Sequence, residues 1–171
     1  TAIDFSLEDE VATRAFSIAW FDVRWFFEPE LMDIPAGKAS VVHTYEALPS
    51  QSAGVIALSD GETYPRGMWL HSAMPHMHTF GQSITIAVVH PDGTRDTLMT
   101  IPKWDFHWQR EYVWQEPASL DPGDKLAIEC EWDNSVRAQP VIDGTRLTPR
   151  DLTWGEGTAD EMCLAFLYAT L

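Results

Sequence analysis

The stretch SITIAVVHPDGTRDTLMTI, residues 83–101, decides the fold class because it carries the full pattern of a β-hairpin. Its first part alternates Ile84, Ile86 and Val88 with other residues, so these three would face one side of a strand. The central Pro-Asp-Gly-Thr is a typical turn, and the residues after it would return as the partner strand. The sequence therefore predicts antiparallel β structure in the middle of the chain.

Short strands of the same kind are expected on both sides of this hairpin, separated by turns rich in Pro and Gly. No stretch predicts a long helix, so the fold class is all-β, an antiparallel β-sandwich. Periodicity alone leaves jelly-roll and immunoglobulin-like topologies open. The further strands are expected at residues 41–47, 53–58, 67–74, 108–114, 126–132 and 164–170, with a long loop at 133–157 and one long, bulged strand at 15–27.

Composition limits the class of protein. The 171 residues, 45% hydrophobic and 22% charged, predict a single globular domain over 1–171, in which 1–33 form an N-terminal arm and an added strand. A net charge of -15 argues against nucleic acid as a partner. No apolar run reaches the length of a membrane span, so no membrane insertion is expected.

Two short motifs predict a metal site. His76 and His78 lie two residues apart in Pro75-His76-Met77-His78, and in an extended strand both imidazoles would face one side. Met162, in Asp160-Glu161-Met162-Cys163, would add a thioether if the two segments lie side by side. Two neutral imidazoles and a thioether favour copper over zinc, magnesium or calcium. The alternative is a pair of surface histidines and a methionine that fills the core.

Four segments occur in one order along the chain, at residues 73–81, 102–109, 133–135 and 154–163. Together they resemble the C-terminal domain of the type II, ascorbate-dependent copper monooxygenases, with the nearest likeness to bacterial members. This is the family of peptidylglycine α-hydroxylating monooxygenase and dopamine β-monooxygenase. The resemblance runs from about Ile34 to the C-terminus, and its specific part is His-x-His followed by Asp-Glu-Met-Cys.

The resemblance implies a jelly-roll-type sandwich in which His76, His78 and Met162 are catalytic and hold one copper ion per chain. It implies hydroxylation of a carbon centre with dioxygen, with ascorbate as the electron donor. It also implies a disulfide between Cys130 and Cys163, although the residues alone leave two buried free thiols equally open. Such a bridge points to the periplasm or the extracellular space.

The chain departs from the family pattern in three ways. It has no adjacent His-His pair for the second copper, which the family holds on a separate domain. Met74 stands where the peptide-acting member has an arginine for the substrate carboxylate, and Phe166 stands in place of a tyrosine. A glycine-extended peptide is therefore not the expected substrate. The remaining histidines, His43, His71, His90 and His107, are scattered.

Three hypotheses of function follow. The first is a copper monooxygenase acting on a small molecule, whose second electron comes from a further copper domain or an electron-donor protein. The second is a non-catalytic copper-binding module for metal handling or assembly. The third is a carbohydrate-binding sandwich that uses some of its eight Trp as stacking platforms; exposed, coplanar rings would support it and buried rings would exclude it.

Neighbouring polar residues carry weaker expectations. In a continuous strand, His71 would face away from the pair of histidines. Asp105 and Gln109 are candidates to hydrogen-bond the outer nitrogen of a ligand histidine, as metal sites need. The aromatic residues around them, beside His107, are expected in the core. Asp160 and Glu161 would point to opposite faces, which excludes a paired-carboxylate glycosidase site.

Overall fold

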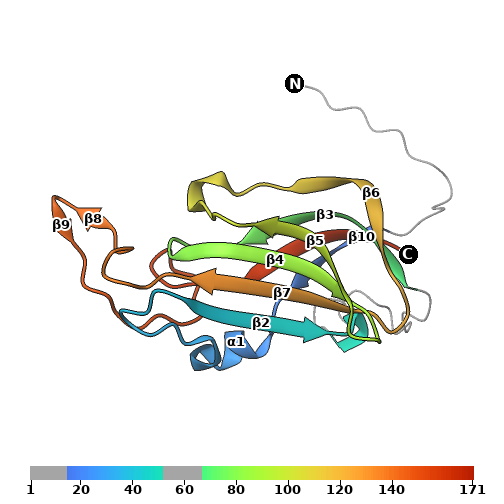
Figure 1. Cartoon of the computed structure of the whole chain (residues 1–171), viewed down its shortest axis with the longest axis horizontal. Helices are drawn as coiled ribbons and strands as arrows, with labels where there is room; N and C mark the ends of the chain where they lie inside the picture. The colour runs from blue at the N-terminus through green and yellow to red at the C-terminus, as the bar shows by residue number, and fades with distance from the viewer. Residues whose placement is uncertain (1–14, 52–66) are drawn as a thin grey trace, which may run out of the picture.

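The computed structural model describes residues 15–51 and 67–171. Two four-stranded antiparallel sheets pack against each other as a sandwich (Figure 1). One sheet has the strand order β1-β10-β3-β6 and the other the order β2-β7-β4-β5. Their bounds are β1 Ala15–Trp20, β2 Val41–Ala47, β3 Met68–His76, β4 Gly81–Val89, β5 Arg95–Ile101, β6 Tyr112–Leu120, β7 Lys125–Trp132 and β10 Leu164–Thr170.

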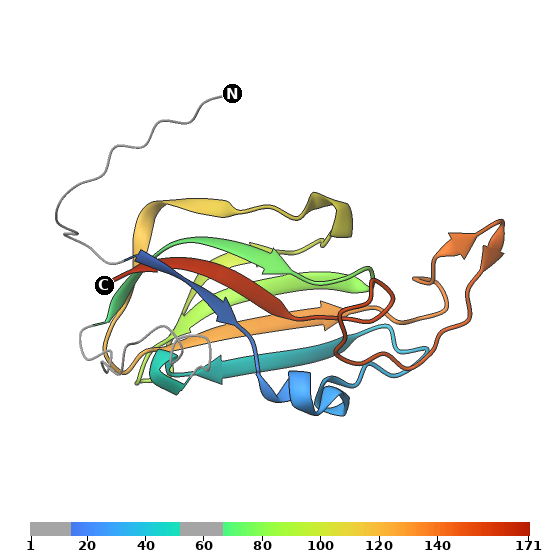
Figure 2. The same cartoon turned by 180° about the vertical axis from the view of Figure 1, so that it is seen from behind.

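The topology is that of a jelly roll. Leaving aside the small β8–β9 hairpin, the first of the eight main strands pairs with the last, and the fourth with the fifth. The second pairs with the seventh and the third with the sixth, as in a long antiparallel hairpin rolled into two sheets. Figure 2 shows β1, β10 and β3 side by side on the near sheet. The predicted all-β sandwich of jelly-roll type is confirmed.

The core lies between the two sheets and follows the alternation that the sequence predicts. Ile84, Ile86 and Val88 of β4 are buried, as are Cys130 and Trp132 of β7. Because one side of each strand is buried, a shift of one residue in register would expose these side chains. The sequence pattern therefore fixes which face of β7 carries its cysteine.

A disulfide joins the two sheets. Cys130 of β7 and Cys163, the residue before β10, are bonded at 2.10 Å, and both are completely buried. The predicted bridge is confirmed, and it ties the start of β10, with Met162 beside it, to the opposite sheet.

The N-terminal segment differs from the expected long strand. β1 ends at Trp20, and a helical turn follows, α1 (Arg24–Phe27), then a 3-10 turn, η1 (Pro29–Met32). The Asp22 carboxylate accepts the Arg24 backbone N–H at 3.0 Å and also binds its guanidinium, which favours a turn here. A strand through residue 27 was therefore a wrong prediction.

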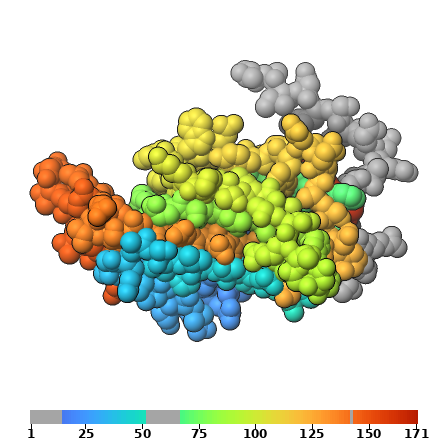
Figure 3. Space-filling model, viewed as in Figure 1, coloured from blue at the N-terminus to red at the C-terminus, as the bar shows by residue number. Residues whose placement is uncertain are grey.

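The remaining connections differ from the sequence-based expectation at one place. The segment expected as a loop at 133–157 contains a two-stranded hairpin, β8 (Val141–Ile142) with β9 (Thr145–Arg146), which projects from one end of the molecule (Figure 3). Short 3-10 turns lie at η2 (Pro49–Gln51) and η3 (Phe106–Trp108). The strand expected at 53–58 lies outside the described residues. No helix among the described residues is long and apolar enough to cross a membrane.

Candidate metal centre

The end of β3 and the start of β10 bring the two predicted motifs together. In the antiparallel register, Leu164 is opposite His76 and Ala165 is opposite Pro75. Beyond this pair the two segments stay in contact, because Nδ1 of His78 lies 2.9 Å from the Asp160 carbonyl oxygen. Met162 is partly buried and packs against the core, and it lies between Glu161, which binds the His78 backbone, and the disulfide cysteine.

The two imidazoles are neighbours. The ring centroids of His76 and His78 are 5.1 Å apart, and the ring planes are nearly perpendicular, at 89°. Met77 between them is completely buried, as alternation along an extended segment requires. His78 is 5% exposed and its ring also contacts Phe106, whereas His76 is half-buried. The two imidazoles therefore lie at the end of β3, partly shielded from solvent.

Hydrogen bonds determine which nitrogen of His76 is free. Its Nδ1 lies 2.5 Å from Oε1 of Gln109, and Nε2 of Gln109 donates to the Phe106 carbonyl at 2.8 Å. A carbonyl only accepts, so the second bond fixes the orientation of the Gln109 amide. Nδ1 of His76 must then carry the proton and donate it to Gln109. This leaves the Nε2 lone pair of His76 available for a metal ion.

The same argument applies to His78. Its Nδ1 lies 2.9 Å from the backbone carbonyl of Asp160, which can only accept a hydrogen bond. Nδ1 therefore donates, and Nε2 keeps its lone pair. A metal-binding imidazole usually holds its other nitrogen in such a bond, because the bond fixes the tautomer and the ring orientation. Both predicted ligand histidines have this arrangement.

The electrostatics of the site favour neutral imidazole. Burial lowers the pKa of His76, the Gln109 hydrogen bond opposes this, and a charge on His78 would lower the pKa further. A neutral ring is the form that binds a metal. Among the described residues, no three His, Cys, Asp or Glu side chains gather as a metal site. A thioether such as that of Met162 is a ligand that suits cuprous copper.

Glu161 holds the segments of the site together. This completely buried carboxylate accepts the His78 backbone N–H at 3.0 Å and the Phe80 backbone N–H at 2.7 Å. It also accepts the indole N–H of Trp132, on the opposite sheet, at 2.8 Å. Burial raises the pKa of Glu161 to about 7, and these hydrogen bonds oppose the rise. One side chain therefore links the histidine segment, the start of β10 and β7.

The sequence did not reveal this role of Glu161. Its signal in the sequence is a charged residue two positions before a cysteine and next to an apolar strand. The two carboxylates do point apart: Glu161 is buried, whereas Asp160 is partly exposed and pairs with Arg150 at 3.1 Å. The exclusion of a paired-carboxylate site agrees with this geometry.

Of the two candidates for the outer nitrogen of a ligand histidine, only Gln109 makes the contact. Asp105 instead accepts the His107 backbone N–H at 2.9 Å and caps η3. The aromatic residues of this block divide between core and surface, because Trp104 is buried and Trp108 is 64% exposed. Their expected place in the core is thus correct for Trp104 and wrong for Trp108.

His71 faces the same side of β3 as His76, contrary to the expectation. A register shift between Leu70 and Ser72 changes the alternation of the strand. The ring of His71 contacts the ring of Tyr168, and its Nε2 lies 2.9 Å from the Thr170 hydroxyl. It lies five residues along the strand from His76, so it is not part of the imidazole pair.

Comparison with known proteins identifies the family. Residues 46–169 match the family described as copper type II ascorbate-dependent monooxygenase, C-terminal domain. The chain belongs to this family. The matched range contains the imidazole pair, Met162 and both disulfide cysteines.

The chain is also similar, at low identity, to curated proteins named as monooxygenases. DBH-like monooxygenase protein 1 of Gallus gallus is 26% identical over 108 residues, which is 63% of this chain and 16% of the relative. The protein of that name in Homo sapiens is 27% identical over 104 residues, 60% of this chain and 15% of the relative. The chain thus corresponds to about a sixth of the length of these relatives.

The two positions that depart from the family pattern lie opposite each other. Met74 of β3 pairs with Phe166 of β10, one step along the same face from the pair of His76 and Leu164. Met74 is 39% and Phe166 is 41% exposed. The surface next to the imidazoles is therefore apolar and carries no cation at these positions.

Proposed function

We propose that the chain, one domain over residues 1–171, binds one copper ion through Nε2 of His76, Nε2 of His78 and the thioether of Met162. We further propose that it hydroxylates a carbon centre of a small molecule with dioxygen, with ascorbate as reductant. The observation that carries the proposal is the hydrogen bonding of both imidazoles through Nδ1, which leaves the Nε2 lone pairs of two neighbouring rings available for a metal ion. Met162 follows Glu161, whose carboxylate accepts the His78 backbone N–H. Family membership supports the choice of copper.

Bound copper would supply the one-electron chemistry that dioxygen activation requires. Overall, one oxygen atom would enter a C–H bond of the substrate and the other would leave as water, with two electrons from the reductant. The chain itself orients the ligands. Gln109 and the Asp160 carbonyl hold the two rings, while Glu161 fixes the backbone at His78. The burial of His78 limits the access of water to that ligand.

The second electron is proposed to come from outside the described domain. Of the remaining histidines, His43 bonds the Asp33 carbonyl, and His90 lies between two carboxylates. The partner that fits the family is a second copper domain or an electron-donor protein. The buried disulfide supports a periplasmic or extracellular location, where such bonds persist.

The alternative is a copper-binding module without turnover. It is favoured because the described residues contain no group of three His, Cys, Asp or Glu that could hold a second copper ion. The carbohydrate-binding hypothesis is disfavoured, because five of the eight Trp are buried: Trp20, Trp25, Trp104, Trp132 and Trp154. The two exposed ones, Trp69 and Trp108, lie on different elements, β3 and η3.

Oxygen consumption with ascorbate separates the two functions. The copper-loaded chain is compared with His78→Ala at equal total copper, which controls for oxidation by free metal, and with His107→Ala, an exposed histidine. A monooxygenase would consume oxygen and form hydroxylated product or peroxide in the native chain and in His107→Ala, but not in His78→Ala. Tight copper binding without oxygen consumption would identify the binding module.

A further inference from the structure

A pocket of about 280 Å³ lies outside the metal centre. It is formed by the end of β5, the connection that carries η3 and the start of β6, and β5 and β6 are edge strands of the two sheets. Trp114 of β6 donates its indole N–H to the Leu98 carbonyl of β5 at 2.9 Å and so holds the two edges together. The pocket is lined by Ile101, Lys103, Trp104, Asp105, Trp108 and Tyr112.

The walls of the pocket suit a flat ring. Three of its six lining residues are aromatic, and the indole of Trp108 is 64% exposed. Trp104 is held in place, because its Nε1–H donates to the His78 carbonyl at 3.0 Å and its ring packs on Gly81. A Cβ at Gly81 would approach the Trp104 ring to 2.7 Å, so glycine is needed for this position of the indole. Aromatic surfaces that are fixed in advance bind planar ligands by stacking.

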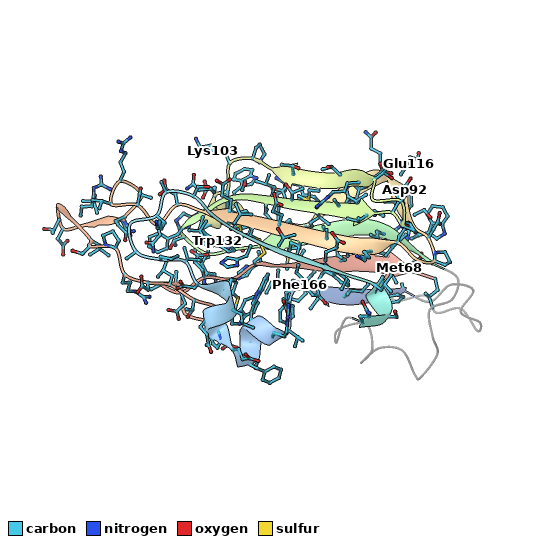
Figure 4. The ribbon with its side chains drawn as sticks, turned by 60° about the horizontal axis from the view of Figure 1, so that its bottom comes forward. Met68, Asp92, Lys103, Glu116, Trp132 and Phe166 are labelled. Atoms are coloured by element: carbon cyan, nitrogen blue, oxygen red, sulfur yellow. A yellow bond between two sulfur atoms is a disulfide. The ribbon has the colours of Figure 1, made fainter. Side chains whose placement is uncertain are left out.

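The charges around the pocket favour an anion. Lys103 is exposed and makes no ion pair or hydrogen bond with any other described residue, in a chain with a net charge of -15. Figure 4 shows Lys103 at the surface, toward the same end of the sandwich as Trp132. Asp105 is the opposing carboxylate, and it keeps its negative charge while it accepts the His107 backbone N–H. The Arg110 guanidinium lies 5.7 Å from the ring centroids of both Trp108 and Tyr112, so a second cation lies beside the pocket and the two cations outnumber this carboxylate.

We infer that this pocket is a binding site for a small planar-ring monocarboxylate, with the ring against Trp108 and the carboxylate at Nζ of Lys103. The volume is just below the usual range for drug-sized ligand sites, which suits a single ring with one short acidic group. The residues of the proposed copper site do not line the pocket. Binding should therefore occur in the metal-free chain, independently of the proposed enzymatic function.

The chain is first freed of metal with a chelator, and the chelator is then removed. The test is titration of this metal-free chain with benzoate, followed by tryptophan fluorescence and calorimetry. Benzamide, the neutral analogue, is titrated in parallel. A dissociation constant on the order of 1 mM is expected for benzoate, as for a ligand of this size. Lys103→Gln should raise the dissociation constant of benzoate about tenfold, which corresponds to one charge-assisted hydrogen bond. It should leave the dissociation constant of benzamide unchanged. Trp108→Ala should weaken both ligands.

Trp69→Ala is the matched control, since Trp69 is also half-exposed but lies on β3 outside the pocket. It should bind benzoate as the native chain does. Three results would overturn the inference: no saturable benzoate binding, equal binding of benzoate and benzamide, or tighter binding of benzylamine than of benzoate. The last would show that Asp105, not Lys103, decides the charge of the ligand.

Discussion

Glu161→Gln tests whether one buried carboxylate holds the metal-site segments together. In the native chain one oxygen of Glu161 accepts the Phe80 N–H, and the other accepts the N–H groups of His78 and Trp132. The amide of Gln keeps only one acceptor oxygen, so at least one of these buried N–H groups loses its partner and the others lose a charged one. We expect the free energy of unfolding to fall by about 2–3 kcal/mol.

The assay is urea unfolding followed by tryptophan fluorescence and circular dichroism, together with the melting temperature. For a chain of this length, the expected loss corresponds to a melting temperature lower by roughly 4–12 °C. Asp160→Asn is the matched control, because its carboxylate is partly exposed and, among the described residues, its one ion pair is with Arg150 at the surface. That pair should contribute about 1 kcal/mol or less. Equal stability of Glu161→Gln and the native chain would refute the role of Glu161.

Three further predictions concern other parts of the molecule. Gln109→Ala should weaken copper binding by about 10–100-fold, because the imidazole of His76 loses its hydrogen-bond partner. Gln115→Ala, at an exposed position, should bind copper as the native chain does, and calorimetric titration checks both variants. Replacing Cys130 and Cys163 together by Ala should lower the free energy of unfolding by about 4 kcal/mol, given their separation of 33 residues, and an unchanged urea midpoint would contradict this. Hydrogen bonds to two aspartates raise the pKa of His90 in the folded chain. The contribution of His90 to the free energy of unfolding should therefore be complete below about pH 6.5 and be lost as the pH rises through the folded-state pKa. Plots of the free energy of unfolding against pH for His90→Gln should lack this loss.

Much of the fold could be predicted from the sequence where strands alternate and turns are strong. The bounds of β5 and β10 agree with the predicted ranges, because a Pro-Asp-Gly-Thr turn and a buried strand face fix them. The segment after Trp20 could not be predicted by the same rule. There, a local carboxylate–backbone bond at Asp22 turns the chain, and the aromatic residues that suggested a strand include Phe26 and Phe27, both exposed.

The site shows a similar division. The spacing of His76 and His78 predicted two neighbouring imidazoles, and periodicity predicted that Cys130 is buried. The pairing of that cysteine with Cys163 came from the family resemblance. The roles of Glu161 and the orientation of His71 depend on contacts between distant segments and on a strand bulge. Neither leaves a periodic mark in a single sequence.

X-ray absorption spectroscopy of the copper-loaded, reduced chain tests the central claim most directly. We expect one copper ion per chain with two imidazole nitrogens and one sulfur as ligands, and loss of the sulfur signal in Met162→Ile. Copper bound with no sulfur ligand in the native chain, or an unchanged spectrum after replacement of Met162, would contradict the account.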